Sequence, residues 1–237
     1  MKNLLTRIIK KSLRIYSNLI DVLIFGEAFS LTYAQEGEDM VLKRIFNNQL
    51  NGFYVDVGAH HPMRFSNTYN FYKIGWHGIN IEPNPDSYSL FKKHRSKDVN
   101  INCGVAKKNG SLEYYMFNES ALNTFDGEVF NSRIQNTNFK HINTVSIEVV
   151  TLTDLLDMHL PRNQKIDYLT IDVEGLDLDV IKSNDWQKYR PSWVLVEQLN
   201  LSDIEDLDFE THHYMKSVGY VLFAKTYNTL FYKDTGI

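Results

Sequence analysis

Short apolar runs alternate with amphipathic segments along most of the chain, and this pattern predicts an α/β fold. The run Phe53-Tyr-Val-Asp-Val57 is rich in β-branched and aromatic residues, which suits a strand buried on both faces of a parallel sheet. The other predicted strands, with helical stretches between most of them, are 78–82, 99–102, 166–171, 193–198, 220–224 and 229–232. We therefore expect a mostly parallel sheet with a C-terminal antiparallel strand and helices on both faces.

The helix predicted after Glu82 begins at Asn84-Pro85, because Asn caps helix starts well and Pro suits the first helical position. Basic residues crowd its other end, where the helix dipole favours positive charge. We interpret the cluster 92–95, which ends at Arg95, as a solvated helix end rather than a phosphate site.

Residues 2–25 combine basic and apolar positions at helical spacing, which predicts a basic amphipathic helix ahead of the main domain. Polar residues interrupt the apolar run, so it is too short to span a bilayer, and no signal-peptide cleavage site follows it. Its charge pattern favours peripheral contact with an anionic membrane surface, at the inner face of the membrane. The alternative is a helix packed on the domain or on a partner subunit of an oligomer. We divide the chain into this helix, 1–30, and a domain, 31–237.

The alternation of strands and helices breaks between residues 107 and 150. Strands are predicted over 111–117 and 144–150, where polar and apolar residues alternate. The residues between them, 118–142, are polar and rich in Asn, with three widely spaced Phe residues. We interpret this segment as an insertion or lid near the active site, with a mobile surface loop as the alternative.

Two neighbouring predicted strands end in residues that suit a nucleotide. Gly58 follows the first strand, where a residue without Cβ allows a sharp turn and close approach of a ligand. Glu82 ends the second strand, where a carboxylate accepts hydrogen bonds from ribose hydroxyls. The carboxyl ends of parallel strands share one edge of a sheet, so we expect the binding site there.

The turn after Gly58 distinguishes between classes of nucleotide. A dinucleotide fold requires G-x-G-x-x-G to seat a pyrophosphate, but Ala59, His60, His61 and Pro62 follow Gly58 with no second glycine. S-adenosylmethionine (SAM) has no pyrophosphate and removes that requirement. Asp56 is then a candidate to meet the cationic amino-acid end of SAM.

Three further acids lie at predicted strand ends. Asp172 and Glu174 follow the strand 166–171, and Glu197 lies near the end of 193–198. Carboxylates this close raise one another's pKa unless a cation intervenes, so they predict either a shared-proton base or a site for a divalent cation such as Mg²⁺ or Mn²⁺. The alternatives are that Asp172 and Glu174 cap the following helix and that Glu197 faces solvent. His60 and His61 are further candidates for a catalytic base.

Composition sets outer bounds on function. The 237 residues are 43% hydrophobic and 23% charged, which is ordinary for one α/β domain. A net charge of −4 gives no pull toward nucleic acid. The single cysteine, Cys103, excludes an internal disulfide and fits the reducing cytoplasm; its apolar context predicts a buried core residue.

Several motifs in chain order resemble the FkbM family of SAM-dependent methyltransferases. The resemblance runs from about residue 33 to 199 and rests on five segments, 33–39, 55–60, 66–69, 80–85 and 171–175. It implies a Rossmann-like class I methyltransferase fold and O-methylation, frequently of sugars in glycans or of polyketide hydroxyls. The cofactor-binding residues that we expect are Gln35, Asp56, Gly58, Ala59, Asn67, Glu82, Pro83, Gly104 and Val105.

The sequence thus predicts a SAM-dependent O-methyltransferase acting on a hydroxyl, with a glycan or a nucleotide- or lipid-linked sugar as acceptor. Asp172 is our first candidate for the base or metal ligand, followed by Glu174, Glu197, His60 and His61. One alternative is a SAM- or nucleotide-binding module without chemistry, recruited to a membrane by the N-terminal helix. Another is an NAD-dependent sugar-modifying enzyme, against which the missing glycines argue.

Overall fold

The computed structural model describes residues 30–47, 49–136, 138–199 and 207–236. Contacts within the chain divide it into two units, 1–32 and 33–237, and the account below concerns the second unit. The amphipathic helix predicted over 2–25 lies outside the described residues. Within the described ranges, no helix is both long and apolar enough to cross a membrane.

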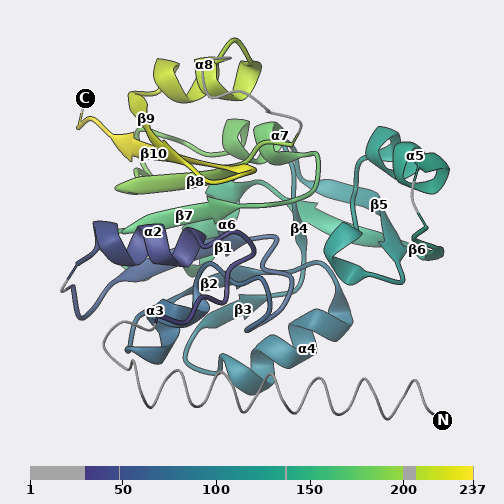
Figure 1. Cartoon of the computed structure of the whole chain (residues 1–237), viewed down its shortest axis with the longest axis horizontal. Helices are drawn as coiled ribbons and strands as arrows, with labels where there is room; N and C mark the ends of the chain where they lie inside the picture. Colours follow the sequence, from purple (N-terminus) through teal and green to yellow (C-terminus); the bar gives the residue numbers. More distant parts are fainter. Residues whose placement is uncertain (1–29, 48, 137, 200–206, 237) are drawn as a thin grey trace. The chain divides into compact units, whose positions relative to one another are not determined.

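A seven-stranded sheet forms the centre of the domain (Figure 1). The strand order is β3-β2-β1-β7-β8-β10-β9, and every neighbouring pair is parallel except those made by β10, which is antiparallel to both β8 and β9. The predicted Rossmann-like sheet with one antiparallel C-terminal strand is therefore confirmed. The strands are β1 (Phe53–Val57), β2 (His77–Ile81), β3 (Val99–Ile101), β7 (Tyr168–Ile171), β8 (Trp193–Glu197), β9 (Tyr220–Lys225) and β10 (Thr229–Asp234).

Helices cover both faces of this sheet, as predicted. The α4 helix begins after Asn84, whose side chain accepts a hydrogen bond from the backbone N–H of Asp86 at 3.0 Å, so the predicted cap is confirmed. The helices are α2 (Glu38–Ile45), α3 (Tyr69–Lys73), α4 (Pro85–His94), α5 (Gly127–Asn136), α6 (Leu152–His159), α7 (Asp177–Lys182) and α8 (Glu210–Ser217), with a 3₁₀ turn, η1 (Ser120–Leu122).

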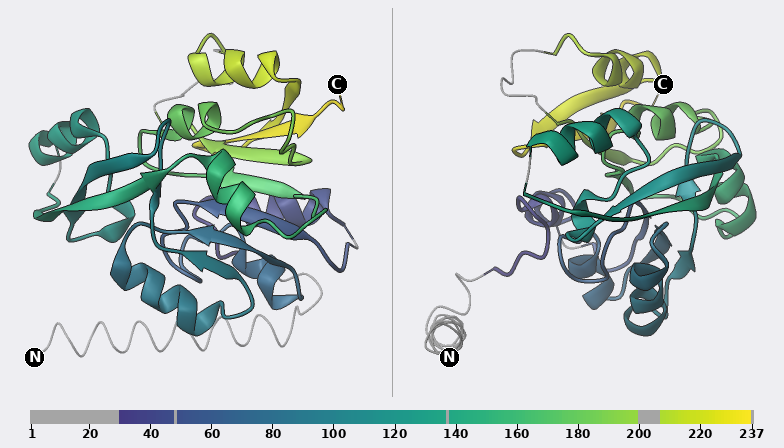
Figure 2. Two further views of the ribbon diagram at one scale, coloured as in Figure 1. Left: turned by 180° about the vertical axis from the view of Figure 1, so that it is seen from behind. Right: turned by 90° about the vertical axis from the view of Figure 1, so that its right-hand side faces the viewer.

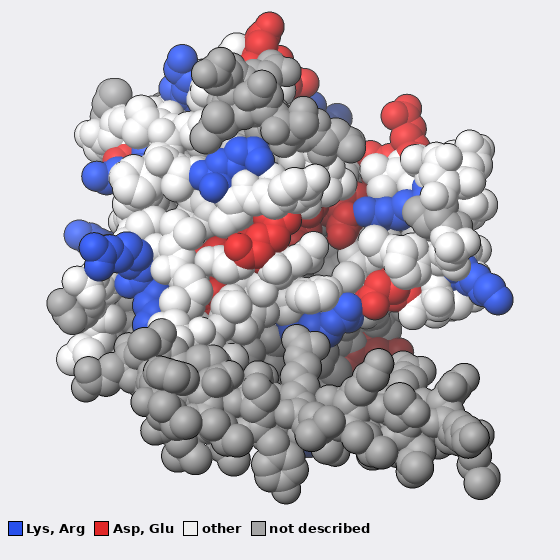
Figure 3. All heavy atoms as spheres, viewed as in Figure 1, with Lys and Arg blue, Asp and Glu red and all other residues white. Residues whose placement is uncertain are grey.

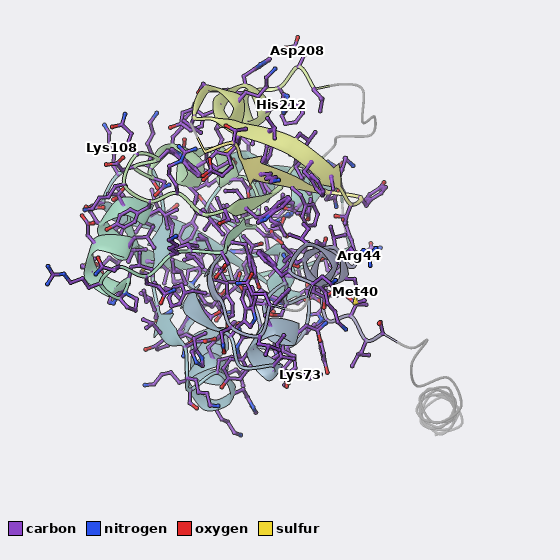
Figure 4. All side chains as sticks on the ribbon, turned by 90° about the vertical axis from the view of Figure 1, so that its left-hand side faces the viewer. Met40, Arg44, Lys73, Lys108, Asp208 and His212 are labelled. Carbon is purple, nitrogen blue, oxygen red and sulfur yellow. The ribbon has the colours of Figure 1, made fainter. Side chains whose placement is uncertain are left out.

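Alternating side chains of β1 divide the core into two clusters. Val55 and Val57 pack in one cluster with apolar residues of α6, α7 and α8. Tyr54 belongs to the other cluster, with residues of α2 and α3. Figure 4 shows Met40 and Arg44 of α2 pointing outward, whereas Leu42 of the same helix is fully buried.

A second, three-stranded sheet is formed by the part of the chain between β3 and β7 of the main sheet. Its strand order is β4-β6-β5, with β4 (Gly104–Val105), β5 (Gly110–Phe117) and β6 (His141–Val150). Figures 1 and 2 show β5, β6 and α5 extending to one side of the central sheet. The predicted insertion, 118–142, is therefore the connection between β5 and β6; it contains η1 and α5 and includes the start of β6, three residues earlier than we predicted.

Arg95 contradicts the prediction of a solvated helix end. Residues 92–94 are exposed, but the Arg95 side chain is fully buried and forms an ion pair with Asp98 at 3.0 Å. Its guanidinium also donates to the Tyr54 hydroxyl at 2.7 Å and to the Thr68 hydroxyl at 2.9 Å. The α4 helix thus ends at a buried polar cluster that contains Arg95, Asp98, Tyr54 and Thr68. No local sequence pattern indicated this cluster.

Candidate active site

A cleft lies where β1, β2 and β7 end, beside the connection between β5 and β6. It encloses about 810 Å³ of space, open mouth included. The structure brings all nine expected cofactor-binding residues to its wall: Gln35, Asp56, Gly58, Ala59, Asn67, Glu82, Pro83, Gly104 and Val105. Their convergence from separate strand ends is the arrangement expected of a ligand site in an open α/β sheet.

The turn after β1 is held against its neighbours by backbone contacts. The N–H groups of Gly58 and Ala59 both donate to the carbonyl of Ile81, each at 3.1 Å. Gly58 has φ of +79°, and a Cβ atom there would lie 1.8 Å from the carbonyl oxygen of Asp172. We expected glycine to allow close approach of a ligand; what the structure shows is close approach of the backbone of Asp172, directly after β7.

Glu82 is buried at the end of β2 with both carboxylate oxygens engaged. One oxygen accepts the backbone N–H of His60 at 2.7 Å, and the other accepts that of Asn84 at 2.8 Å. Burial raises the pKa of Glu82 to about 8 despite these two hydrogen bonds. Each oxygen keeps a lone pair, so the carboxylate is able to accept hydrogen bonds from a diol such as that of ribose.

Asp56 connects the cleft to the buried cluster around Arg95. Its carboxylate accepts a hydrogen bond from the Thr68 hydroxyl at 2.9 Å, and Thr68 in turn accepts one from Arg95. Burial raises the pKa of Asp56 to about 6, against the lowering effects of Thr68 and Arg95. An ionised Asp56 at this wall suits a cationic ligand group.

The three acids predicted at strand ends do converge. Asp172, Glu174 and Glu197 each offer one carboxylate oxygen within 4.8 Å of the others. Asp172 and Glu174 line the cleft, whereas Glu197 does not. Burial, followed by the charge of Glu197, raises the pKa of Asp172 well above its usual range, and burial raises that of Glu197 to about 8.

Neither Asp172 nor Glu174 caps the following helix, which was the alternative role that we considered for them. Asp177 accepts the backbone N–H groups of Val173 and Gly175, both at 3.2 Å, so it secures the turn into α7. Glu174 instead forms an ion pair with Arg133 of α5. The insertion is therefore tied directly to an acid of the cleft.

The two histidines differ in position. His60 lines the cleft; burial, with nearby Arg64, lowers its pKa to about 4, so its ring is neutral at pH 7. His61 does not line the cleft, because its Nδ1 accepts the backbone N–H groups of Met63 and Arg64 at 3.1 and 2.9 Å and closes a local turn. The candidate role of His61 as a base therefore has no support from its position.

β5 and the connection between β5 and β6 contribute cleft residues that the sequence did not single out. They come from β5, from η1 and from the loop that follows it, and are Tyr114, Ser120, Ala121, Asn123 and Phe125. The isolated Phe residues of this polar segment were the one available signal, because a lone aromatic residue among Asn and Ser requires a packing partner. Phe125 finds one in Tyr114, with ring centroids 4.6 Å apart.

Acidic side chains gather along the middle of the face shown in Figure 3. Several buried acids near this edge of the sheet have raised pKa values, about 6 for Asp56 in β1, about 7 for Asp177 at the start of α7 and about 8 for Glu82 after β2, mainly because of burial. Between their unfolded and folded pKa values, the folded chain holds more protons than the unfolded chain. The free energy of unfolding therefore decreases as the pH rises from 5 to 8.

We expect the melting temperature of the ligand-free protein to fall by at least about 5 °C between pH 5.5 and 8.5. Differential scanning fluorimetry across that range measures it. Glu82→Gln removes one titrating group and should flatten the slope. A melting temperature that rises steadily over the same range would contradict the raised pKa values.

Comparison with known proteins bears on the chemistry of this cleft. Residues 56–222, more than half of the chain, match the model of the methyltransferase FkbM domain. No curated protein sequence gives a match. The matched region begins in the strand that ends at the Gly58 turn and includes Glu82, Asp172 and Glu197. The chain therefore belongs to the FkbM methyltransferase family.

Proposed function

We propose that this methyltransferase uses SAM to methylate a hydroxyl group, with the acceptor a sugar in a glycan or a nucleotide- or lipid-linked sugar. The observation that carries the proposal is the convergence of Glu82, at the end of β2, and Asp172, after β7, on a cleft beside the Gly58 turn. Glu82 suits a cofactor ribose, and Asp172 suits an acceptor hydroxyl that must lose its proton.

The residues of the cleft fit the separate parts of SAM. Asp56 offers a buried carboxylate to the ammonium of the methionine part, and Glu82 offers two oxygens to the ribose diol. Gly104 and Val105 line the cleft at the start of the small sheet, which leaves that end for the adenine. When bound, SAM would supply a methyl group on a positively charged sulfur; the acceptor oxygen would bond to the methyl carbon as the carbon–sulfur bond breaks and S-adenosylhomocysteine leaves.

Asp172, beside the Gly58 turn, and Glu197 supply the base in this proposal. Asp172 and Glu197 bring carboxylate oxygens within 4.8 Å of each other, and burial raises the pKa of both. A carboxylate with a raised pKa is a stronger proton acceptor than an ordinary one, which suits removal of a hydroxyl proton during attack. His60, with its pKa lowered to about 4, is the weaker candidate.

Binding of a divalent cation is a second candidate role of the same acids. Asp172, Glu174 and Glu197 are hard oxygen ligands of the type that Mg²⁺ and Mn²⁺ prefer. Glu174 would have to exchange its ion pair with Arg133 for the metal. The proposed proton transfer by the acid pair involves no metal, so chelation separates the two uses.

The test is transfer of a labelled methyl group from SAM to a panel of sugar hydroxyl acceptors. Asp172→Asn should lower the rate at least about 100-fold while leaving SAM affinity nearly unchanged. Asp86→Asn, which alters an exposed acid of α4, is the control and should keep the wild-type rate. A repeat with EDTA decides whether a metal participates.

Two outcomes would contradict the proposal in different ways. If SAM binds and no acceptor is methylated, the alternative of a binding module without chemistry is favoured. If Asp172→Asn methylates at the wild-type rate, the acid pair is not the base.

A further inference from the structure

Asn123, in the connection between β5 and β6, has a buried side-chain NH₂ group that no described residue accepts from. The residue is 6% exposed and lines the cleft. Its Oδ1 accepts the backbone N–H of Phe117 at 2.8 Å, but its Nδ2 has no hydrogen-bond partner among the described residues. A buried donor left without an acceptor is unfavourable, so such a group in a ligand cleft points to an acceptor on the ligand.

The orientation of this amide follows from the backbone. Oxygen and nitrogen of an Asn side chain are assigned from their hydrogen-bond partners. The N–H of Phe117 is a donor and requires an oxygen opposite it, so the NH₂ group of Asn123 must take the other position. On the side of the amide that has no partner, Asn123 thus presents a donor and not an acceptor.

The cleft wall near Asn123 is partly aromatic. The cleft wall beside it includes Tyr114 and Phe125, whose ring centroids are 4.6 Å apart. Phe125 lies directly on Gly104, since a Cβ atom there would be 2.6 Å from the ring. Aromatic rings with one fixed donor suit a flat heteroaromatic group with an acceptor nitrogen at its edge.

Tyr114 places this part of the cleft next to the expected ribose site. Burial raises the pKa of the Tyr114 hydroxyl well above its usual range; the charge of Glu82 adds to that shift, and the polar side chain of Asn123 close to the hydroxyl opposes it. Glu82 and Asn123 are therefore both neighbours of Tyr114. A base attached to a ribose at Glu82 would lie within this neighbourhood.

We propose that Asn123 donates a hydrogen bond from Nδ2 to a ring nitrogen of the SAM adenine. The inference rests on the proposed function and adds a role for the insertion, which then recognises the base of the cofactor. Adenine offers three ring nitrogens at its edges that accept hydrogen bonds, N1, N3 and N7, and each can be replaced singly by carbon.

The experiment compares S-adenosylhomocysteine with its 1-deaza, 3-deaza and 7-deaza analogues by titration calorimetry. Wild-type protein should bind one analogue about tenfold more weakly than the parent compound, because that analogue leaves the buried donor unpaired. In Asn123→Ala the difference between that analogue and the parent should shrink to less than about twofold. Asn131→Ala, at an exposed position of α5, should keep the wild-type difference.

Two further variants keep the test decisive. Asn123→Asp retains an acceptor for the Phe117 N–H but lacks the donor, so it should also lose the discrimination. It takes the place of Asn123→Ala in the test if that variant fails to fold. Tyr114→Phe should keep the discrimination between the analogue and the parent compound. If Tyr114→Phe loses that discrimination as Asn123→Ala does, the Asn123 amide acts on the Tyr114 hydroxyl and not on the adenine, and the inference is wrong.

The remaining outcomes separate this inference from the proposed function. If S-adenosylhomocysteine does not bind at all, the proposed function fails. If it binds, and all three analogues bind equally well or the discrimination survives in Asn123→Ala, only the inference about Asn123 is overturned.

Discussion

Gly58→Ala is expected to lower the free energy of unfolding by at least about 3 kcal/mol and to abolish SAM binding. Two effects combine at this position. The φ of +79° is strained for any residue with a Cβ, and the added atom would lie 1.8 Å from the carbonyl oxygen of Asp172. The obstacle is backbone, so relief requires the end of β7 to move away from β1, and Asp172 moves with it.

Gly37→Ala separates the two effects. Gly37 has φ of +85°, but an added Cβ would meet nothing within 4 Å. This variant should therefore show the strain alone, about 1 kcal/mol, in urea unfolding. If Gly58→Ala were no more destabilising than Gly37→Ala, the close approach of the β1 turn and the end of β7 would be wrong.

Arg95→Met is expected to lower the free energy of unfolding by about 3–5 kcal/mol, since it leaves the fully buried Asp98 without its charge partner. The guanidinium also holds the backbone carbonyl of Pro62 at 3.0 Å, in the segment after His60 and His61. Its loss removes the donor to Thr68, which in turn holds Asp56. SAM affinity should therefore fall together with stability.

Arg64→Met is the matched control. Arg64 pairs with Glu119 at 2.8 Å, but both side chains are partly exposed, 44% and 31%. A pair of this kind contributes less than about 1 kcal/mol. Urea unfolding of both variants measures the difference, and equal losses of stability would contradict the assignment of Arg95 to a buried structural cluster.

The strand ends could be predicted because their signals are local. The apolar run of β1 indicates burial, and the glycine after it and the acid after β2 mark the end of each strand. Since parallel strands end at one edge, Gly58, Glu82 and Asp172 could be placed together without coordinates. The structure brings all three to the cleft.

Other features depend on contacts between distant segments and left no local signal. Arg95 follows three exposed basic residues and differs from them only in that the helix ends there, where its side chain meets Tyr54 and Thr68. Asn123 belongs to a polar segment in which many Asn residues are alike in sequence. What distinguishes Asn123 is the hydrogen bond that its Oδ1 accepts from the backbone N–H of Phe117, at the end of β5.

The central claim is that the cleft at the strand ends binds SAM, and calorimetric titration of the whole chain with SAM and with NAD tests it most directly. We expect SAM to bind at one site per chain, NAD to give no heat of binding, and Glu82→Ala to lose SAM binding while remaining folded. Binding of NAD without binding of SAM would contradict the account.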